Sequence, residues 1–113
     1  MIARVWRGVA TREHADAYEA MLKPELLPGI GKVKGYRGGY VLRRDMGDEI
    51  EFMTIMLWES MDAIRAVSGP DVETAVVPVE RRQYLSRYDA RSVHYEITSA
   101  QGIVASLLGA AKA

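Results

Sequence analysis

The chain has 113 residues, which is enough to bury one hydrophobic core and too few for two domains. Fifteen Lys and Arg residues balance fifteen Asp and Glu residues, so a nucleic-acid partner is not expected. The pairs Arg43-Arg44 and Arg81-Arg82 are interpreted as solvated edges of a strand and a helix. The sequence has no cysteine, which excludes disulfides, thiol catalysis and thiolate metal sites.

Signals for membrane insertion or export are not found either. No apolar run approaches the roughly twenty residues that cross a bilayer. Residues 1–7 contain arginines where a signal peptide needs an uninterrupted apolar stretch. We therefore expect a cytoplasmic protein without a membrane partner.

The first elements are predicted to be a strand and a helix. Residues 2–8 predict a strand that ends at a glycine. Thr11 is then the expected N-cap of a helix, and Pro24 should end or kink this helix. The apolar positions that recur at helical spacing are Ala15, Tyr18, Met21 and Leu22.

Two further strands follow, over residues 35–44 and 49–58, and the glycines of the first indicate a bulge or a close backbone approach. The strand over 49–58 has large apolar residues on both faces. One face carries Ile50, Phe52, Thr54, Met56 and Trp58; the other carries Glu51, Met53, Ile55, Leu57 and Glu59. Helices can cover one face, and a chain this short has no further layer, so a second copy of the sheet is the expected cover.

The last third predicts two helices and a strand. Ser60 should cap the first helix, Pro78 should begin a short helix that runs to about Leu85, and residues 89–97 should form the last strand. The order strand, helix, strand, strand, helix, short helix, strand is the split βαβ arrangement of a ferredoxin-like α+β domain with an antiparallel sheet.

The expected domain spans residues 1–97. The remaining residues, 98–113, form a tail that would carry an apolar stripe if it were helical. Packing on a neighbouring subunit and fraying are both open for this tail.

Several stretches are similar to the antibiotic-biosynthesis monooxygenase superfamily of dimeric α/β-barrels. They are Leu57-Trp58-Glu59-Ser60 with Ala63-Ile64, Gly69-Pro70-Asp71, Ala75-Val76-Val77-Pro78 and Val93-His94-Tyr95-Glu96. The resemblance covers about residues 1–97 and implies a homodimer formed by opposing sheet faces, with a pocket between the sheet and the helices of each subunit. It also implies that Trp58 is a pocket tryptophan.

Two branches of that superfamily suggest different chemistry. The quinone-forming branch oxidises aromatic polyketides with O2 and needs neither metal nor flavin, but Thr54 stands where that branch has an asparagine. The haem-degrading branch takes an axial histidine from the segment after the second helix, and residues 74–78 contain none. The two histidines, His14 and His94, lie in separate elements without metal-ligand spacing, so we expect no metal and no cofactor.

His94 is the candidate base, because an imidazole titrates near neutral pH and could accept a proton from a phenol. A structural role for this histidine at a sheet edge or a dimer seam is the alternative. Trp58 is the other candidate catalytic residue. The candidate substrate-binding residues are Trp6, Tyr18, Arg43, Phe52 and Thr54. The aromatic residues could equally fill the core, and Arg43, which could stabilise an enolate or phenolate, could equally be a surface charge.

The leading hypothesis is a cofactor-independent monooxygenase that acts with O2 on a small aromatic or polyketide-like substrate. The alternative is a non-catalytic dimer that binds a small apolar or aromatic molecule or serves a stress response. Haem degradation is the third and weakest hypothesis.

Overall fold

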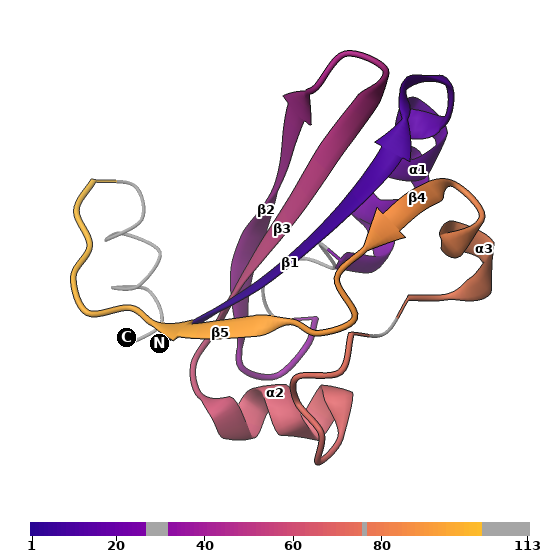
Figure 1. Cartoon of the computed structure of the whole chain (residues 1–113). Helices are drawn as coiled ribbons and strands as arrows, with labels where there is room; N and C mark the ends of the chain where they lie inside the picture. Colours follow the sequence, from indigo (N-terminus) through magenta and orange to yellow (C-terminus); the bar gives the residue numbers. More distant parts are fainter. Residues whose placement is uncertain (27–31, 76, 103–113) are drawn as a thin grey trace.

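The computed structural model describes residues 1–26, 32–75 and 77–102 (Figure 1). Along the chain the elements are β1 (Ile2–Thr11), α1 (Arg12–Leu26), β2 (Tyr36–Asp45), β3 (Glu49–Trp58), α2 (Met61–Ser68), α3 (Val79–Arg82), β4 (Leu85–Tyr88) and β5 (Val93–Glu96). None of the helices in this part of the chain combines the length and the apolar character needed to span a membrane.

β1 lies at the centre of a five-stranded antiparallel sheet. It pairs with β3 over its full length, starting with Ile2 opposite Trp58. Its other edge is shared, because residues 2–5 pair with β5 and residues 8–10 pair with β4. The sheet order is β2-β3-β1-β4, with β5 also beside β1. This order confirms the predicted ferredoxin-like α+β arrangement.

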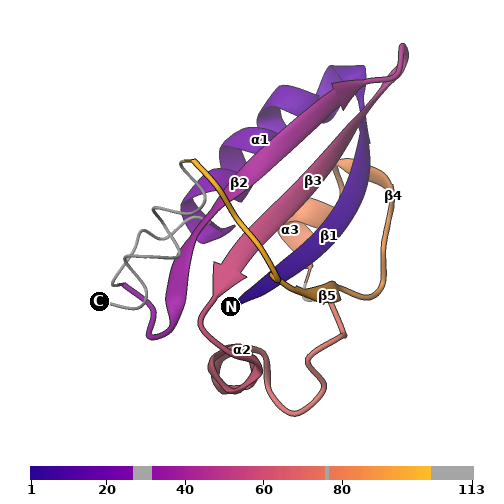
Figure 2. The ribbon, with the colours of Figure 1, turned by 90° about the vertical axis from the view of Figure 1, so that its left-hand side faces the viewer.

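The sheet has one face covered by helices and one open face. Figure 2 shows α1 and α3 behind the sheet, on the same side of it. The helix-facing residues of β3 are Ile50, Phe52, Thr54, Met56 and Trp58, and all except Met56 are at most 4% exposed. The alternation in the sequence therefore predicted the correct set of side chains for this face.

The core under the helices consists of two clusters. In the first, Tyr18 of α1 packs on Phe52 of β3, with ring centroids 5.0 Å apart. In the second, Tyr36 of β2 packs on Trp58, with ring centroids 5.3 Å apart, and Ile64 of α2 completes the cluster. Burial of each of these large apolar side chains is worth about 1.5–3 kcal/mol.

The N-terminal boundaries differ from the prediction. β1 continues to Thr11 instead of ending at Gly8, because its pairing with β3 extends to Glu49. The Thr11 hydroxyl is buried and has no hydrogen-bond partner among the described residues, so it is not the predicted cap. The helix α1 also continues past Pro24 to Leu26.

The strand predicted over residues 89–97 forms only over Val93–Glu96, as β5. The short helix ends at Arg82 instead of about Leu85, and β4 over Leu85–Tyr88 was not predicted. Residues 89–92 form a break between these two strands. The break arises from contacts that are distant in sequence: Asp89 N donates to Arg7 O, and Arg91 forms an isolated bridge with Thr74. The apolar stripe predicted for the tail lies at residues 103–113, outside the described residues.

The glycines of β2 were correctly interpreted. The register between β2 and β3 shifts between Tyr36 and Gly39, which is the expected irregularity. A Cβ atom at Gly39 would lie 2.5 Å from the Ile55 carbonyl oxygen. Only a residue without a side chain allows the two backbones to approach this closely.

Replacing Ser60 with Ala should lower the free energy of unfolding by about 1 kcal/mol. The Ser60 hydroxyl accepts a hydrogen bond of 3.2 Å from Ala63 N and so caps α2 as predicted. Chemical denaturation followed by circular dichroism measures the change. Ser99→Ala, at an exposed position outside the helices and strands, is the matched control. Equal stability of the two variants would show that the cap contributes nothing.

Candidate ligand pocket

A cavity of about 280 Å³ lies between the helix-facing side of the sheet and the helices. This volume is close to the lower limit of about 300 Å³ for ligand sites, so the cavity suits a small molecule. Its lining residues are Arg4, Trp6, Tyr18, Leu22, Thr54, Met56, Trp58, Ile64, Val67, Ser68, Ala75, Val77, Arg81 and Ser92. The described lining is mostly apolar and includes two arginines.

Both tryptophans of the chain line this cavity, but their indole N–H groups differ. Trp6 donates to the Asp89 carbonyl oxygen at 2.6 Å, which fixes its ring. The Trp58 N–H is buried and has no acceptor among the described residues. A buried donor without an acceptor is unfavourable by about 1–3 kcal/mol. A ligand oxygen that reached Trp58 would remove this penalty.

Tyr18 supplies a hydroxyl to the lining from α1. Burial raises the pKa of Tyr18 to about 12, although the nearby Arg81 guanidinium acts to lower it. The phenol therefore remains protonated at neutral pH. Its O–H can donate a hydrogen bond, but it cannot serve as a phenolate.

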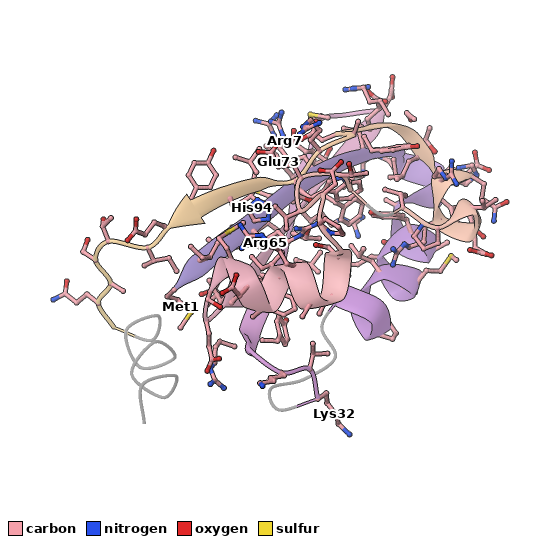
Figure 3. The ribbon with its side chains drawn as sticks, turned by 90° about the horizontal axis from the view of Figure 1, so that it is seen from below. Met1, Arg7, Lys32, Arg65, Glu73 and His94 are labelled. Carbon is pink, nitrogen blue, oxygen red and sulfur yellow. The ribbon has the colours of Figure 1, made fainter. Side chains whose placement is uncertain are left out.

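Arg4 and His94 form a hydrogen-bonded pair on the helix-facing side of the sheet. They lie directly opposite each other on β1 and β5. Figure 3 shows the His94 ring under β5, on the side where α2 lies. Arg4 Nη1 lies 2.8 Å from His94 Nε2 and 2.6 Å from the Val72 carbonyl oxygen. Because a guanidinium can only donate, Nε2 must accept, and the His94 ring is neutral with its proton on Nδ1.

The surroundings of His94 favour this neutral form. Burial lowers the pKa of His94, the positive charge of Arg4 lowers it further, and Glu73 acts in the opposite direction. His94 is half-buried and does not belong to the cavity lining. Since its accepting nitrogen is occupied by Arg4, the structure does not support His94 as the base that deprotonates a substrate.

Four of the seven residues predicted for the site line the cavity. These are Trp6, Tyr18, Thr54 and Trp58. They come from β1, α1 and β3, which the sheet register and the packing of α1 bring together. Their roles toward a ligand remain predictions.

Phe52 and Arg43 lie elsewhere. Phe52 is fully buried against Tyr18 and fills the core. Arg43 is exposed and pairs with Asp16 at 2.8 Å and Glu19 at 3.3 Å on α1, while its guanidinium lies 5.6 Å from the centre of the Phe52 ring. Of the two roles considered for Arg43 from the sequence, its position is therefore that of a surface charge.

Two arginines that line the cavity were not predicted as site residues from the sequence. Arg81 was interpreted as a solvated helix edge, but it is 5% exposed and faces the cavity from α3. The burial of Arg81 depends on the packing of α3 against the rest of the chain, including α1, and the sequence alone does not specify that packing. Arg4 could have been found, because alternation along β1 places it on the same face as Trp6.

Comparisons with known proteins identify the fold and no closer relationship. No protein-family model and no curated protein matches the chain. A solved structure from Bacillus cereus, provisionally named an antibiotic biosynthesis monooxygenase, has a TM-score of 0.62 and 15% identity, covering 90% of this chain and 95% of that chain. A protein of Chloroflexus aurantiacus with the same provisional name has a TM-score of 0.57 and 19% identity, covering 90% and 97%.

A third similar structure is the haem degrader MhuD of Mycobacterium tuberculosis, solved with two haems in its active site. Its TM-score is 0.56 at 17% identity, covering 90% of this chain and 100% of that chain. At these identities the likeness establishes the fold alone. The chain thus has the ferredoxin-like α+β fold of the antibiotic biosynthesis monooxygenase structures, as the sequence resemblance implied.

The cavity residues do not fit a haem. Haem iron is bound by histidine, cysteinate, tyrosinate, or methionine together with histidine. The described lining residues include no histidine that could bind the iron or accompany Met56, and burial, which raises the pKa of Tyr18, disfavours a tyrosinate ligand. Among the residues that the structure describes, no group of three His, Asp or Glu side chains could hold a metal ion either.

Acidification should destabilise the wild-type protein more than a His94→Gln variant. The pKa of His94 in the folded state is lowered from about 6.5, so the unfolded chain binds more protons below about pH 6.5. Stability linked to neutral His94 is therefore complete above that pH and is lost as the pH falls through the lower folded-state pKa. Glutamine keeps an acceptor for Arg4 and does not titrate.

Urea denaturation of both proteins between about pH 7.5 and pH 5 checks this expectation. The free energy of unfolding of the wild type should fall relative to that of the variant toward low pH. Parallel pH profiles would show that His94 has the same pKa in both states.

Proposed function

We propose that the protein binds a small aromatic molecule in the cavity beside Trp58 and oxidises it with O2, without a metal or an organic cofactor. The observation that carries this proposal is the apolar cavity of about 280 Å³ walled by Trp6, Tyr18 and Trp58. Aromatic side chains bind flat rings by stacking and edge contacts. The fold that holds this cavity is shared with structures provisionally named as monooxygenases.

The reaction class that fits this cavity is conversion of a phenol to a quinone. One oxygen atom of O2 bonds to a ring carbon and becomes the new carbonyl oxygen. The other leaves as water with the phenolic hydrogen and the hydrogen of that carbon. All four electrons that reduce O2 come from the substrate, so the contribution of the protein is to hold the substrate in position.

The lining residues have distinct roles in this proposal. Trp6, fixed by its bond to Asp89, stacks on the ring. The Trp58 indole N–H and the Tyr18 hydroxyl donate hydrogen bonds to substrate oxygens. Since the described lining residues include neither a carboxylate nor a histidine, the phenolic proton passes to water in this proposal.

A second candidate function is a binding protein that does not catalyse a reaction. The observation that favours it is that no carboxylate or histidine is found among the described residues of the lining. Such a protein would bind the same small aromatic molecules and release them unchanged. Oxygen consumption separates the two functions.

Trp58→Phe should reduce kcat/KM for oxidation of 1-naphthol about five- to tenfold, because it keeps the aromatic wall and removes one neutral hydrogen bond. An oxygen electrode and the absorbance of the 1,4-naphthoquinone product measure the rate. Ser86→Ala, which removes a polar hydrogen from an exposed side chain outside the cavity, is the control and should keep the wild-type rate.

Each outcome of this experiment has a distinct meaning. Binding of 1-naphthol by the wild type without oxygen uptake would replace the oxidase proposal by the binding-protein function. Absence of binding would overturn both. Equal rates for Trp58→Phe and the wild type would show that the indole N–H does not contact the substrate.

We also propose that two copies of the chain pair through the open face of the sheet. This face carries the exposed Leu42, Val93 and Tyr95, which are 46%, 47% and 57% exposed, beside half-buried Met53 and Ile55. Large apolar groups on a sheet face favour a covering layer. In Figure 1 residues 98–102 leave β5 on the side away from α1 and α3 and run outward from the sheet.

Ile55→Asp should convert a dimer into a monomer or an aggregate. The change places a carboxylate in the middle of the proposed interface, where burying it without a partner would cost several kcal/mol. Sedimentation velocity measures the oligomeric state. Val79→Asp, at a residue of α3 that is 67% exposed, is the control and should remain dimeric. A monomeric wild type would overturn the proposal, and a dimeric Ile55→Asp variant would place the interface elsewhere.

A further inference from the structure

We propose that Arg4 is the anion-binding residue of the cavity and that the ligand is a small aromatic molecule with an anionic oxygen. This inference rests on the proposed binding of an aromatic molecule beside Trp58 and names its chemical class. Carboxylate, phenolate and enolate oxygens share the required chemistry. A neutral hydrocarbon of the same shape does not.

The hydrogen bonds of Arg4 leave one edge of its guanidinium free. Nη1 carries two hydrogens, and they are directed to the Val72 carbonyl oxygen at 2.6 Å and to His94 Nε2 at 2.8 Å. Among the described residues, Nε and Nη2 have no acceptor, and the side chain lines the cavity. The Nε–H and one Nη2–H of a guanidinium are parallel, which is the geometry that binds a carboxylate through two hydrogen bonds.

The charge of Arg4 also favours an anionic ligand. No Asp or Glu is found among the described residues that line the cavity. Burial lowers the pKa of Arg4, and no carboxylate among the described residues pairs with its guanidinium. A half-buried cation without a counter-ion loses hydration and gains no compensating attraction. An anionic ligand would supply that attraction where the surrounding groups are mostly apolar.

His94 is a positioning residue in this arrangement. Its Nε2 and the Val72 carbonyl hold both hydrogens of Nη1, so the guanidinium plane is fixed from the side opposite its free edge. A long arginine side chain that is already held in place loses less conformational entropy when it binds an anion. His94 thus acts on the ligand through Arg4, without contact of its own.

Paired ligands that differ in charge test this inference directly. Isothermal titration calorimetry at pH 7.5, without added substrate, measures the dissociation constants of 2-naphthoate and of its neutral analogue 2-naphthamide. The wild type should bind the carboxylate at least about tenfold more tightly, as expected for charge-assisted hydrogen bonds. This comparison needs no variant, so it does not depend on how a substitution affects folding.

Variants then locate the preference. Arg4→Met should abolish it and leave the affinity for the amide within about twofold, whereas Arg82→Met, at an exposed arginine outside the lining, should retain it. His94→Gln should retain the preference because it keeps an acceptor, and His94→Leu should reduce it. A full preference in His94→Leu would overturn the positioning role.

The outcomes distinguish this inference from the proposed function. If the wild type binds both compounds equally, the cavity is a ligand site but Arg4 is not its anion-binding residue. If the wild type binds neither compound, the proposed binding of aromatic molecules fails as well. If Arg4→Met keeps the preference for naphthoate, another cation binds the anion and the assignment to Arg4 is wrong.

Discussion

The antiparallel pairing of β1 with β3 determines which side chains share the cavity. Residues directly opposite each other in such a pair point to the same face. Arg4 is opposite Met56 and Trp6 is opposite Thr54, so the register brings these four lining residues to the helix side together. A slip by one residue would send the corresponding side chains of one strand to the open face and would dismantle the site.

The same central strand also supplies the polar part of the site. β5 pairs with the edge of β1 that β3 leaves free, and its register puts His94 opposite Arg4. The histidine ring and the guanidinium therefore meet because of backbone hydrogen bonds rather than because of their mutual attraction. A charged donor and a neutral acceptor then satisfy each other in a partly buried place, where an unpaired group would be unfavourable.

Local patterns in the sequence predicted the parts of the fold that depend on neighbouring residues. Alternation over 49–58 identified the buried face of β3, the glycines identified the irregularity of β2, and Ser60 identified the start of α2. The separation of β4 from β5 could not be predicted in this way. It depends on contacts such as Asp89 N to Arg7 O, which join residues more than eighty positions apart.

The candidate site also combines features set by local sequence patterns with features set by contacts that are distant in sequence. Trp6, Tyr18, Thr54 and Trp58 face the cavity because strand alternation and helix periodicity direct them there, and both patterns are visible in the sequence. The side of the sheet that His94 faces was not predicted from the sequence. The hydrogen bond that occupies its ring nitrogen was not predicted either, because its partner lies 90 residues away.

The positions of the two tryptophans have a consequence for how this molecule interacts with light. The chain contains two tryptophans, and both line the cavity. Indole emission changes with the polarity of its surroundings and with nearby electron acceptors. Under ultraviolet excitation, the fluorescence of the folded protein therefore originates almost entirely from the cavity wall. Its emission wavelength and intensity should differ between a cavity that holds water and one that holds an aromatic ligand.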